Sequence, residues 1–187
     1  FYYKWTPKVE ASAGYTFRDY TTTIGSDTQD HFFNVGARGG FTPLLTGEFS
    51  VGVTTRNFAS GPISSQSMLG LTAQLNYALT PKTTLQLTSS SAPDTSPQGA
   101  QQKNFSLGGT VSSTISDQWS VRGGLSWRAM DYGTRTDDFI EGNLGATYVV
   151  NTYVSVIGSY VYRHNKSVLA SGEFTENVFS VAANLRY

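Results

Sequence analysis

The stretch FSVAANLRY, residues 179–187, decides the fold class. Its apolar and aromatic residues occupy every second position, and the positions between them are small or polar. The first set is Phe179, Val181, Ala183, Leu185 and Tyr187, and the second is Ser180, Ala182, Asn184 and Arg186. A period of two is that of a β-strand, whose successive side chains point to opposite faces. The stretch therefore predicts a strand with one apolar face and one polar face.

The same alternation recurs along the whole chain, for example over residues 9–18 and 33–41. About ten such strands can be counted, most of them near the 9 to 11 residues that cross a bilayer obliquely. The pattern predicts an all-β chain with a single domain over residues 1–187. We expect it to be a transmembrane antiparallel up-and-down β-barrel of the outer membrane.

The connections between these strands alternate in length. Tight turns are expected at residues 42–46, 80–83, 116–118 and 150–152. Long loops rich in Asp, Pro and Ser are expected at residues 21–30, 59–66, 91–102, 131–138 and 164–172. Outer-membrane barrels have short turns on the periplasmic side and long external loops, so the asymmetry also predicts the orientation.

A repeat of hairpin size supports the up-and-down order. Thr6-Pro7-Lys8, Thr42-Pro43 and Thr80-Pro81-Lys82 recur at similar intervals, and Ser116 follows after another such interval. By this comparison, residues 1–5 correspond to the end of a strand that runs toward the short turns. We therefore expect them to be the remnant of an upstream strand, which would make the chain the C-terminal part of a larger barrel. The alternative is a short tail at the membrane interface, where Tyr and Trp are common.

The composition of the two faces favours a membrane barrel over a secreted β-sandwich or fibre module. The apolar face carries no charged residue, as lipid contact requires, because an Arg or Lys near the bilayer midplane costs about 2–4 kcal/mol. Many aromatic residues are expected near strand ends, where they would form two interfacial girdles, whereas a sandwich core would place them in mid-strand. These aromatic residues are Tyr15, Phe17, Phe33, Phe41, Tyr77, Phe105, Trp119, Trp127, Tyr148, Tyr160 and Tyr162.

The overall composition excludes several classes. Lys and Arg number 13 and Asp and Glu number 13, so the formal net charge is zero and gives no basic footprint for nucleic acid. Charged residues are 14% of the chain, well below the roughly 25% of soluble domains. No Cys is present, which excludes disulfides and thiolate metal sites. No apolar run approaches the length of a membrane helix.

The polar face holds the candidate lumen-facing residues. They are Glu10, Arg18, Arg38, Glu48, Arg56, Arg122, Arg128, Glu141, Arg163, Glu176 and Arg186. Seven arginines against four glutamates leave a surplus of three positive charges, so an open lumen would mildly prefer anions. The alternative is that Arg and Glu pair across neighbouring strands and plug a narrow barrel.

Catalytic, metal and cofactor sites are not expected. His31 and His164 are the only histidines, both placed by the pattern at strand-loop junctions, and Asp30, His31 and nearby serines are the one enzymatic alternative. No nucleophile elbow, metal-binding His pair or phosphate loop is present. The cluster Asp131, Asp137 and Asp138 could bind Ca²⁺, although a solvated loop explains it as well.

The last strand resembles the terminal signal of bacterial outer-membrane proteins, which ends in an aromatic residue preceded by apolar residues at every second position. In those proteins the barrel-assembly machinery reads the signal. The resemblance implies that Phe179, Val181, Ala183, Leu185 and Tyr187 serve insertion.

Most of the chain resembles the outer-membrane β-barrel porins of type 2, found at exopolysaccharide and exosortase-type loci of Gram-negative bacteria. The resemblance rests on residues 79–85, 137–138 with 145–148, 159–163 before 165–167, and 174–177. It implies a passive pore for small hydrophilic solutes or an exported saccharide, in contact with outer-membrane lipid and lipopolysaccharide. The rival interpretation is a non-conducting barrel that anchors or binds partners through its external loops.

Overall fold

The computed structural model describes residues 1–21, 27–59, 65–95, 101–133 and 135–186. Within these ranges the chain forms one sheet of 11 strands. The strands are β1 (Tyr2–Lys4), β2 (Val9–Tyr20), β3 (Thr28–Gly40), β4 (Leu45–Phe58), β5 (Ser65–Thr80), β6 (Thr83–Thr95), β7 (Gln101–Thr114), β8 (Trp119–Asp131), β9 (Thr136–Val149), β10 (Val154–Lys166) and β11 (Phe174–Leu185). The prediction of an all-β fold is confirmed, with β1 as the strand beyond the expected ten. No helix in the described ranges is long and apolar enough to cross a membrane.

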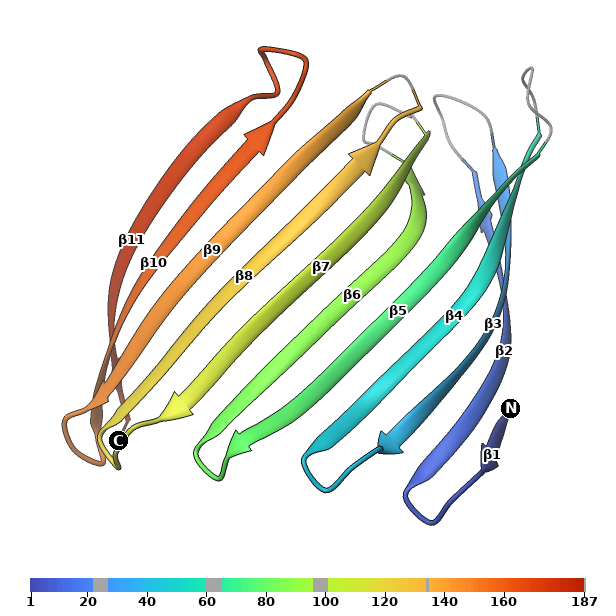
Figure 1. Cartoon of the computed structure of the whole chain (residues 1–187). Coiled ribbons are helices and arrows are strands. Elements are labelled where there is room, and N and C mark those ends of the chain that lie inside the picture. The colour runs from blue at the N-terminus through green and yellow to red at the C-terminus, as the bar shows by residue number, and fades with distance from the viewer. Residues whose placement is uncertain (22–26, 60–64, 96–100, 134, 187) are drawn as a thin grey trace.

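Every strand pairs antiparallel with the next along the chain, so the sheet is an up-and-down meander that curves strongly (Figure 1). A β-sandwich would need two packed sheets, and the described residues form one. β1 and β11 are the two edges, and no pairing joins them in the part of the chain described. Both edge strands run in the same direction, because alternate strands of a meander are parallel. The sheet is therefore a barrel wall that is not closed, and β1 covers only Glu10–Ser12 of β2.

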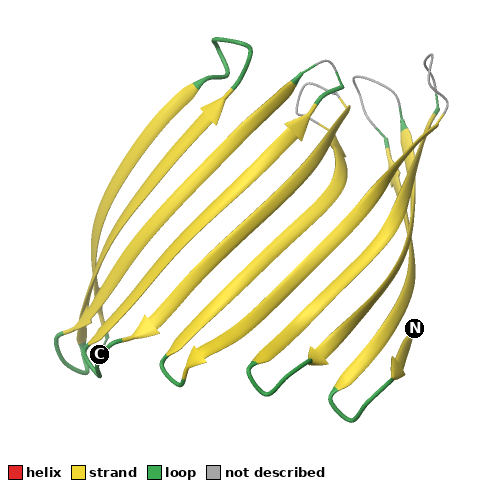
Figure 2. Cartoon of the chain, viewed as in Figure 1, coloured by secondary structure: helices red, strands yellow, loops and turns green. Residues whose placement is uncertain are grey.

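The short turns lie together at one end of the sheet and the longer connections at the other (Figure 2). Each short turn is capped by a side-chain oxygen that accepts backbone N–H groups two or three residues later. Thr42 Oγ1 accepts from Leu44 N at 3.3 Å and Leu45 N at 2.9 Å. The same kind of bond is made by Thr6, Thr80, Ser116 and Asn151. The hairpin repeat is thus a repeat of capped turns, and Asn151, in the turn expected at residues 150–152, is a fifth member that the Thr and Ser repeat did not include.

At the opposite end the strands are longer than expected. β6 runs to Thr95 and β7 begins at Gln101, so the loop expected at residues 91–102 is mostly strand. Likewise β9 begins at Thr136 and β10 reaches Lys166. Ladder hydrogen bonds join backbone groups and continue where the side chains become polar. The Asp and Ser residues therefore mark where the apolar band ends, not where the sheet ends. Residues 22–26, 60–64 and 96–100, within three of the expected loops, lie outside the described residues.

Burial is inverted relative to a water-soluble protein. No apolar side chain is buried in the described ranges, and apart from Gly70 the buried residues are polar or charged. They are Thr28, Asp30, Thr54, Arg56, Asp137 and Asn165. Large apolar residues are exposed instead, Val181 by 83% and Leu125 by 64%. Soluble proteins bury such residues, so this distribution is that of a sheet whose outer surface contacts lipid.

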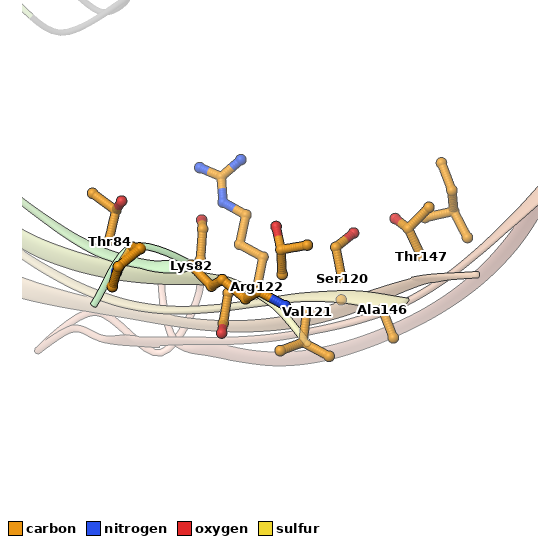
Figure 3. A pocket seen from close by; sticks show the side chains of 13 residues that line it. Lys82, Thr84, Ser120, Val121, Arg122, Ala146 and Thr147 are labelled. Atoms are coloured by element: carbon orange, nitrogen blue, oxygen red, sulfur yellow. The ribbon is translucent and has the colours of Figure 1, made fainter. Parts of the chain in front are cut away.

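The strand register separates the two faces. In Figure 3 Val121 and Ala146 point toward the convex side of the curved sheet, while Arg122, Ser120 and Thr147 point toward the concave side. Side chains of cross-strand partners share a face, so the pairing extends this assignment from strand to strand. Most apolar positions of β2 to β11 fall on the convex face and most polar positions on the concave face, with exceptions such as Phe32 and Ile157 on the concave face and Asp138 on the convex face.

Aromatic side chains on the convex face gather at two levels. Toward the long connections, the rings of Phe105 and Trp127 lie 5.6 Å apart, measured between centroids. Near the short turns, the rings of Trp119 and Tyr148 are 4.7 Å apart. Both levels fit interfacial girdles. Tyr15, Phe33 and Tyr160 depart from the prediction, because they lie near the middle of β2, β3 and β10. The Tyr160 hydroxyl donates to Asn177 Oδ1 at 2.7 Å.

Candidate channel lining

All the lumen candidates that lie in strands fall on the concave face, most of them in three groups. Glu10, Arg38 and Glu48 are consecutive cross-strand partners on β2, β3 and β4. Glu141, Arg163 and Glu176 are partners on β9, β10 and β11. Arg122 and Arg128 of β8 form the third group. They lie on the same face as Ser126, whose cross-strand partner is Glu141, so this group also lies on the concave face. The remaining candidates are Arg18 and Arg56, which flank Asp30, and Arg186, which follows β11 and donates its backbone N–H to Tyr153 O.

A buried ion pair lies on this face toward the long connections. Arg56 Nε and Nη2 donate to the two carboxylate oxygens of Asp30 at 2.6 and 2.7 Å. The two side chains are only 4% and 3% exposed. Sequence reasoning missed Asp30 as a lumen residue because it assigned this position to a loop. The signal was present, since Asp30 is in phase with Asn34 and Arg38 on β3.

The outer strands carry more exposed pairs. Arg38 Nη2 lies 2.8 Å from Glu10 Oε2, and the Arg38 guanidinium carbon stands 3.8 Å from the centre of the Tyr2 ring. Arg163 donates to Glu141 at 2.7 Å and to Glu176 at 3.0 Å. These arginines are therefore neutralised by neighbouring acids, as the plugged alternative predicts for part of the lining.

The concave face also holds acids that were not counted. Asp30 is paired with Arg56, and Asp137 accepts a hydrogen bond from Ser167 Oγ at 2.7 Å and lies 3.6 Å from Arg135 Nε. The count of seven arginines against four glutamates is therefore incomplete, and it also leaves out two basic residues, Arg135 beside Asp137 and Lys82. A preference for anions depends on where the unpaired cations lie as well as on the total charge.

A hollow of about 710 Å³ opens on the concave face of β6 to β9, near the short turns (Figure 3). Its lining includes Lys82, Thr84, Ser112, Ser120, Arg122 and Thr147. Arg122 is exposed and stands up from the sheet, and no acid in the described ranges pairs with it. Arg128, on the same strand, has its guanidinium carbon 5.8 Å from the centre of the Phe139 ring.

The hollow exists because the residues around Arg122 are small. Its cross-strand partners are Ser112 and Gly145, and its neighbours on the same face of β8 are Ser120 and Gly124. A Cβ added at Gly145 would meet only the Gly158 carbonyl oxygen, at 3.7 Å. No side chain of these positions is long enough to cover or to pair the guanidinium.

The model of the family described as "Putative beta-barrel porin 2" matches residues 3–187. The chain belongs to this family. The resemblance drawn from the sequence is thereby confirmed, and the chain is an outer-membrane barrel of the porin type. No curated protein matches the chain.

Solved structures with the same fold are outer-membrane porins and related barrels. The NanC porin matches with a TM-score of 0.50 at 10% identity, over 96% of this chain and 94% of that chain. A loop L8 deletion mutant of OmpT, an outer-membrane protein of Vibrio cholerae, matches with a TM-score of 0.50 at 11% identity, over 96% of this chain and 76% of that chain. At such low identity these matches show the fold alone.

The histidines of this porin-family barrel do not form a catalytic group with Asp30. His31 points to the convex face, where its Nδ1 is 2.8 Å from the Tyr15 hydroxyl, while Asp30 points to the concave face. His164 also lies on the convex face, with Nδ1 2.9 Å from Thr175 Oγ1. Both histidines lie within strands and not at the junctions expected for them.

The three aspartates considered for Ca²⁺ do not converge. Asp137 faces the concave side, and its neighbour Asp138 faces the convex side, where it accepts the Trp127 indole N–H at 3.1 Å. Asp131 Oδ1 accepts the Gly133 backbone N–H at 2.7 Å. No metal-ligating cluster occurs among the described residues.

The apolar residues of the terminal strand lie on the convex face of edge strand β11. Phe179 and Leu185 are 78% and 71% exposed, and Val181 and Ala183 share their face. Tyr187 lies outside the described residues. The strand thus presents an apolar stripe along an edge of the sheet.

Proposed function

We propose that this protein is a passive pore of the bacterial outer membrane for small hydrophilic solutes. The observation that carries the proposal is the concave face of β5 to β9, which is lined mainly by hydroxyl, amide and glycine positions and opens into the hollow around Arg122. A wall of this kind replaces the hydration of a polar solute and leaves room for its passage. The family adds an exported saccharide as a second solute class.

A non-conducting barrel is the rival function, and one part of the structure favours it. The Phe32 ring lies over Gly52 and Gly70 on the concave face, so that a Cβ at Gly70 would stand 2.6 Å from Phe32 Cε2. Together with the buried Arg56–Asp30 pair, this ring narrows the space in front of β3 to β5. A barrel filled in this way would serve as an anchor or as a support for external loops.

Ion conductance in planar lipid bilayers distinguishes the two functions. A pore gives discrete conductance steps in KCl, and Arg122→Glu combined with Arg128→Glu moves the reversal potential in a KCl gradient toward cation selectivity. The shift is expected because a channel wall exchanges two positive charges for two negative ones. Arg122→Lys with Arg128→Lys, which keeps the charges, is the matched control and should leave the selectivity unchanged.

Silent bilayers would contradict the pore and support the rival function, provided that the same preparation is folded. Folding is checked by β-type circular dichroism and by resistance to unfolding in detergent before each reconstitution.

We propose further that the convex face contacts outer-membrane lipid and lipopolysaccharide, and that the barrel-assembly machinery reads β11. The exposed apolar stripe of Phe179, Val181 and Leu185 supports both. We expect no enzymatic activity, because His31 and Asp30 lie on opposite faces of β3.

A further inference from the structure

The hollow on β6 to β9 differs from the rest of the described concave face in its charge. Elsewhere Arg38, Arg56 and Arg163 are each held by a carboxylate within 3.0 Å. Among the described residues, the lining of the hollow includes two basic side chains, Arg122 and Lys82, and no acidic one. The hollow is therefore a locally positive region, in contrast to the three places on the concave face where a carboxylate neutralises an arginine.

The guanidinium of Arg122 is available for a ligand. It has no ion pair in the described ranges, and it stands among Ser112, Ser120, Gly124 and Gly145, none of which reaches over it. A guanidinium presents N–H donors in a planar fork that matches the two oxygens of a carboxylate or the oxygens of a phosphate. The geometry leaves this fork pointing into the open space of the hollow.

The walls of the hollow offer hydroxyl groups beside apolar side chains such as Ile157. Thr84, Ser112, Thr114, Ser120 and Thr147 belong to the lining, and the register places all five on the concave face. Hydroxyls both donate and accept hydrogen bonds, so they suit a ligand that itself carries several hydroxyls. The volume of about 710 Å³ is within the range of small-molecule sites, about 300–1,000 Å³.

We propose that this hollow is a binding subsite for sugars that carry an oxyanion, either a carboxylate or a phosphate. Arg122 takes the oxyanion, Lys82 adds positive charge at the turn between β5 and β6, and the Ser and Thr hydroxyls bind the sugar hydroxyls. The inference rests on the proposed pore, because the subsite lies on the wall along which solutes would pass.

The test is block of the KCl current through single channels of the full chain by added sugars. Glucuronate and glucose 6-phosphate are compared with glucose, which has the hydroxyls and lacks the oxyanion. We expect the two anions to block at lower concentration than glucose. Arg122→Gln should weaken block by the anions about tenfold or more, because hydrogen bonds to a charged group contribute about 1.5–3 kcal/mol.

Arg128→Gln is the matched control, since it removes the same charge from the same face of the same strand but lies outside the lining of the hollow. It should shift the reversal potential as Arg122→Gln does and leave block by the anions unchanged. Equal block by glucose and glucuronate, or equal loss of block in the two variants, would overturn the subsite. A folded wild-type protein that conducts no current would instead overturn the pore itself, so the two failures are distinguishable.

Discussion

At the scale of single residues, Arg56 and Asp30 form the most buried ion pair of the described residues, with side chains only 4% and 3% exposed. Removing one partner leaves a buried charge without compensation, which costs about 3–5 kcal/mol. We expect Arg56→Met to lower the free energy of unfolding by this amount, measured by urea titration in lipid vesicles. The double variant Arg56→Met, Asp30→Leu should recover most of the loss, because no isolated charge remains.

The exposed pair of Arg38 with Glu10 supplies the control for this prediction. Its side chains are 46% and 31% exposed, and pairs of this kind contribute about 0–1 kcal/mol. A cost for Arg38→Met equal to that for Arg56→Met would show that burial does not distinguish the two pairs.

Sequence reasoning identified which charges share a face but not which of them pair. The phase of Arg38, Arg163 and Glu141 followed from alternation alone, because period two assigns a face to every strand residue. Their partners depend on strand register, which the sequence does not state. Asp30 was missed as a lumen-facing residue for a different reason. Residues 21–30, which include it, have the polar composition of a loop.

At the scale of elements, the capped turns explain why the short connections are alike. Thr42→Ala removes the acceptor for Leu44 N and Leu45 N, and the loss of such bonds costs about 0.5–1.5 kcal/mol. We expect the free energy of unfolding to fall by that amount. Thr42→Ser keeps the oxygen and should retain wild-type stability, and an equal loss in both variants would mean that the side-chain methyl group, not the hydrogen bond, is responsible.

The short turns could be predicted to within a few residues, and the ends of the strands on the other side could not. Thr42 and Thr80 indicate turns because a Thr hydroxyl oxygen can accept a hydrogen bond from the backbone N–H group two residues later. This interaction depends only on neighbouring residues. By contrast, the extension of β6 to Thr95 depends on pairing with β7, whose residue Gln101 is the partner of Thr95. That information is not local, so the polar composition of residues 91–102 indicated a loop.

For the whole molecule, the sequence predicts the inversion of faces and a barrel wall, but not whether the described strands close into a complete barrel. One face of the predicted sheet carries apolar residues without charges, and the opposite face carries polar residues with all the arginines. Such a sheet requires lipid on one side and water on the other. The strong curvature of the sheet and its unpaired edges β1 and β11 were not predictable from alternation, which specifies faces but not the twist between strands.

The most direct test of the central claim, that the concave face lines a water-filled channel and the convex face contacts lipid, is a cysteine scan of β8. The chain has no Cys of its own, so each substitution introduces a single thiol. Variants at Ser120, Arg122, Gly124 and Ser126 report on the concave face, and variants at Val121, Gly123, Leu125 and Trp127 on the convex face.

In protein reconstituted into lipid vesicles, a charged thiol reagent that does not cross membranes should label the first set rapidly and the second set at least about tenfold more slowly, because the charged reagent is excluded from hydrocarbon. This strict alternation along one strand is the result that the account predicts. Equal protection of both sets would mean that the concave face is dry, and faster labelling of Val121 and Leu125 than of Arg122 would mean that the faces are assigned the wrong way round.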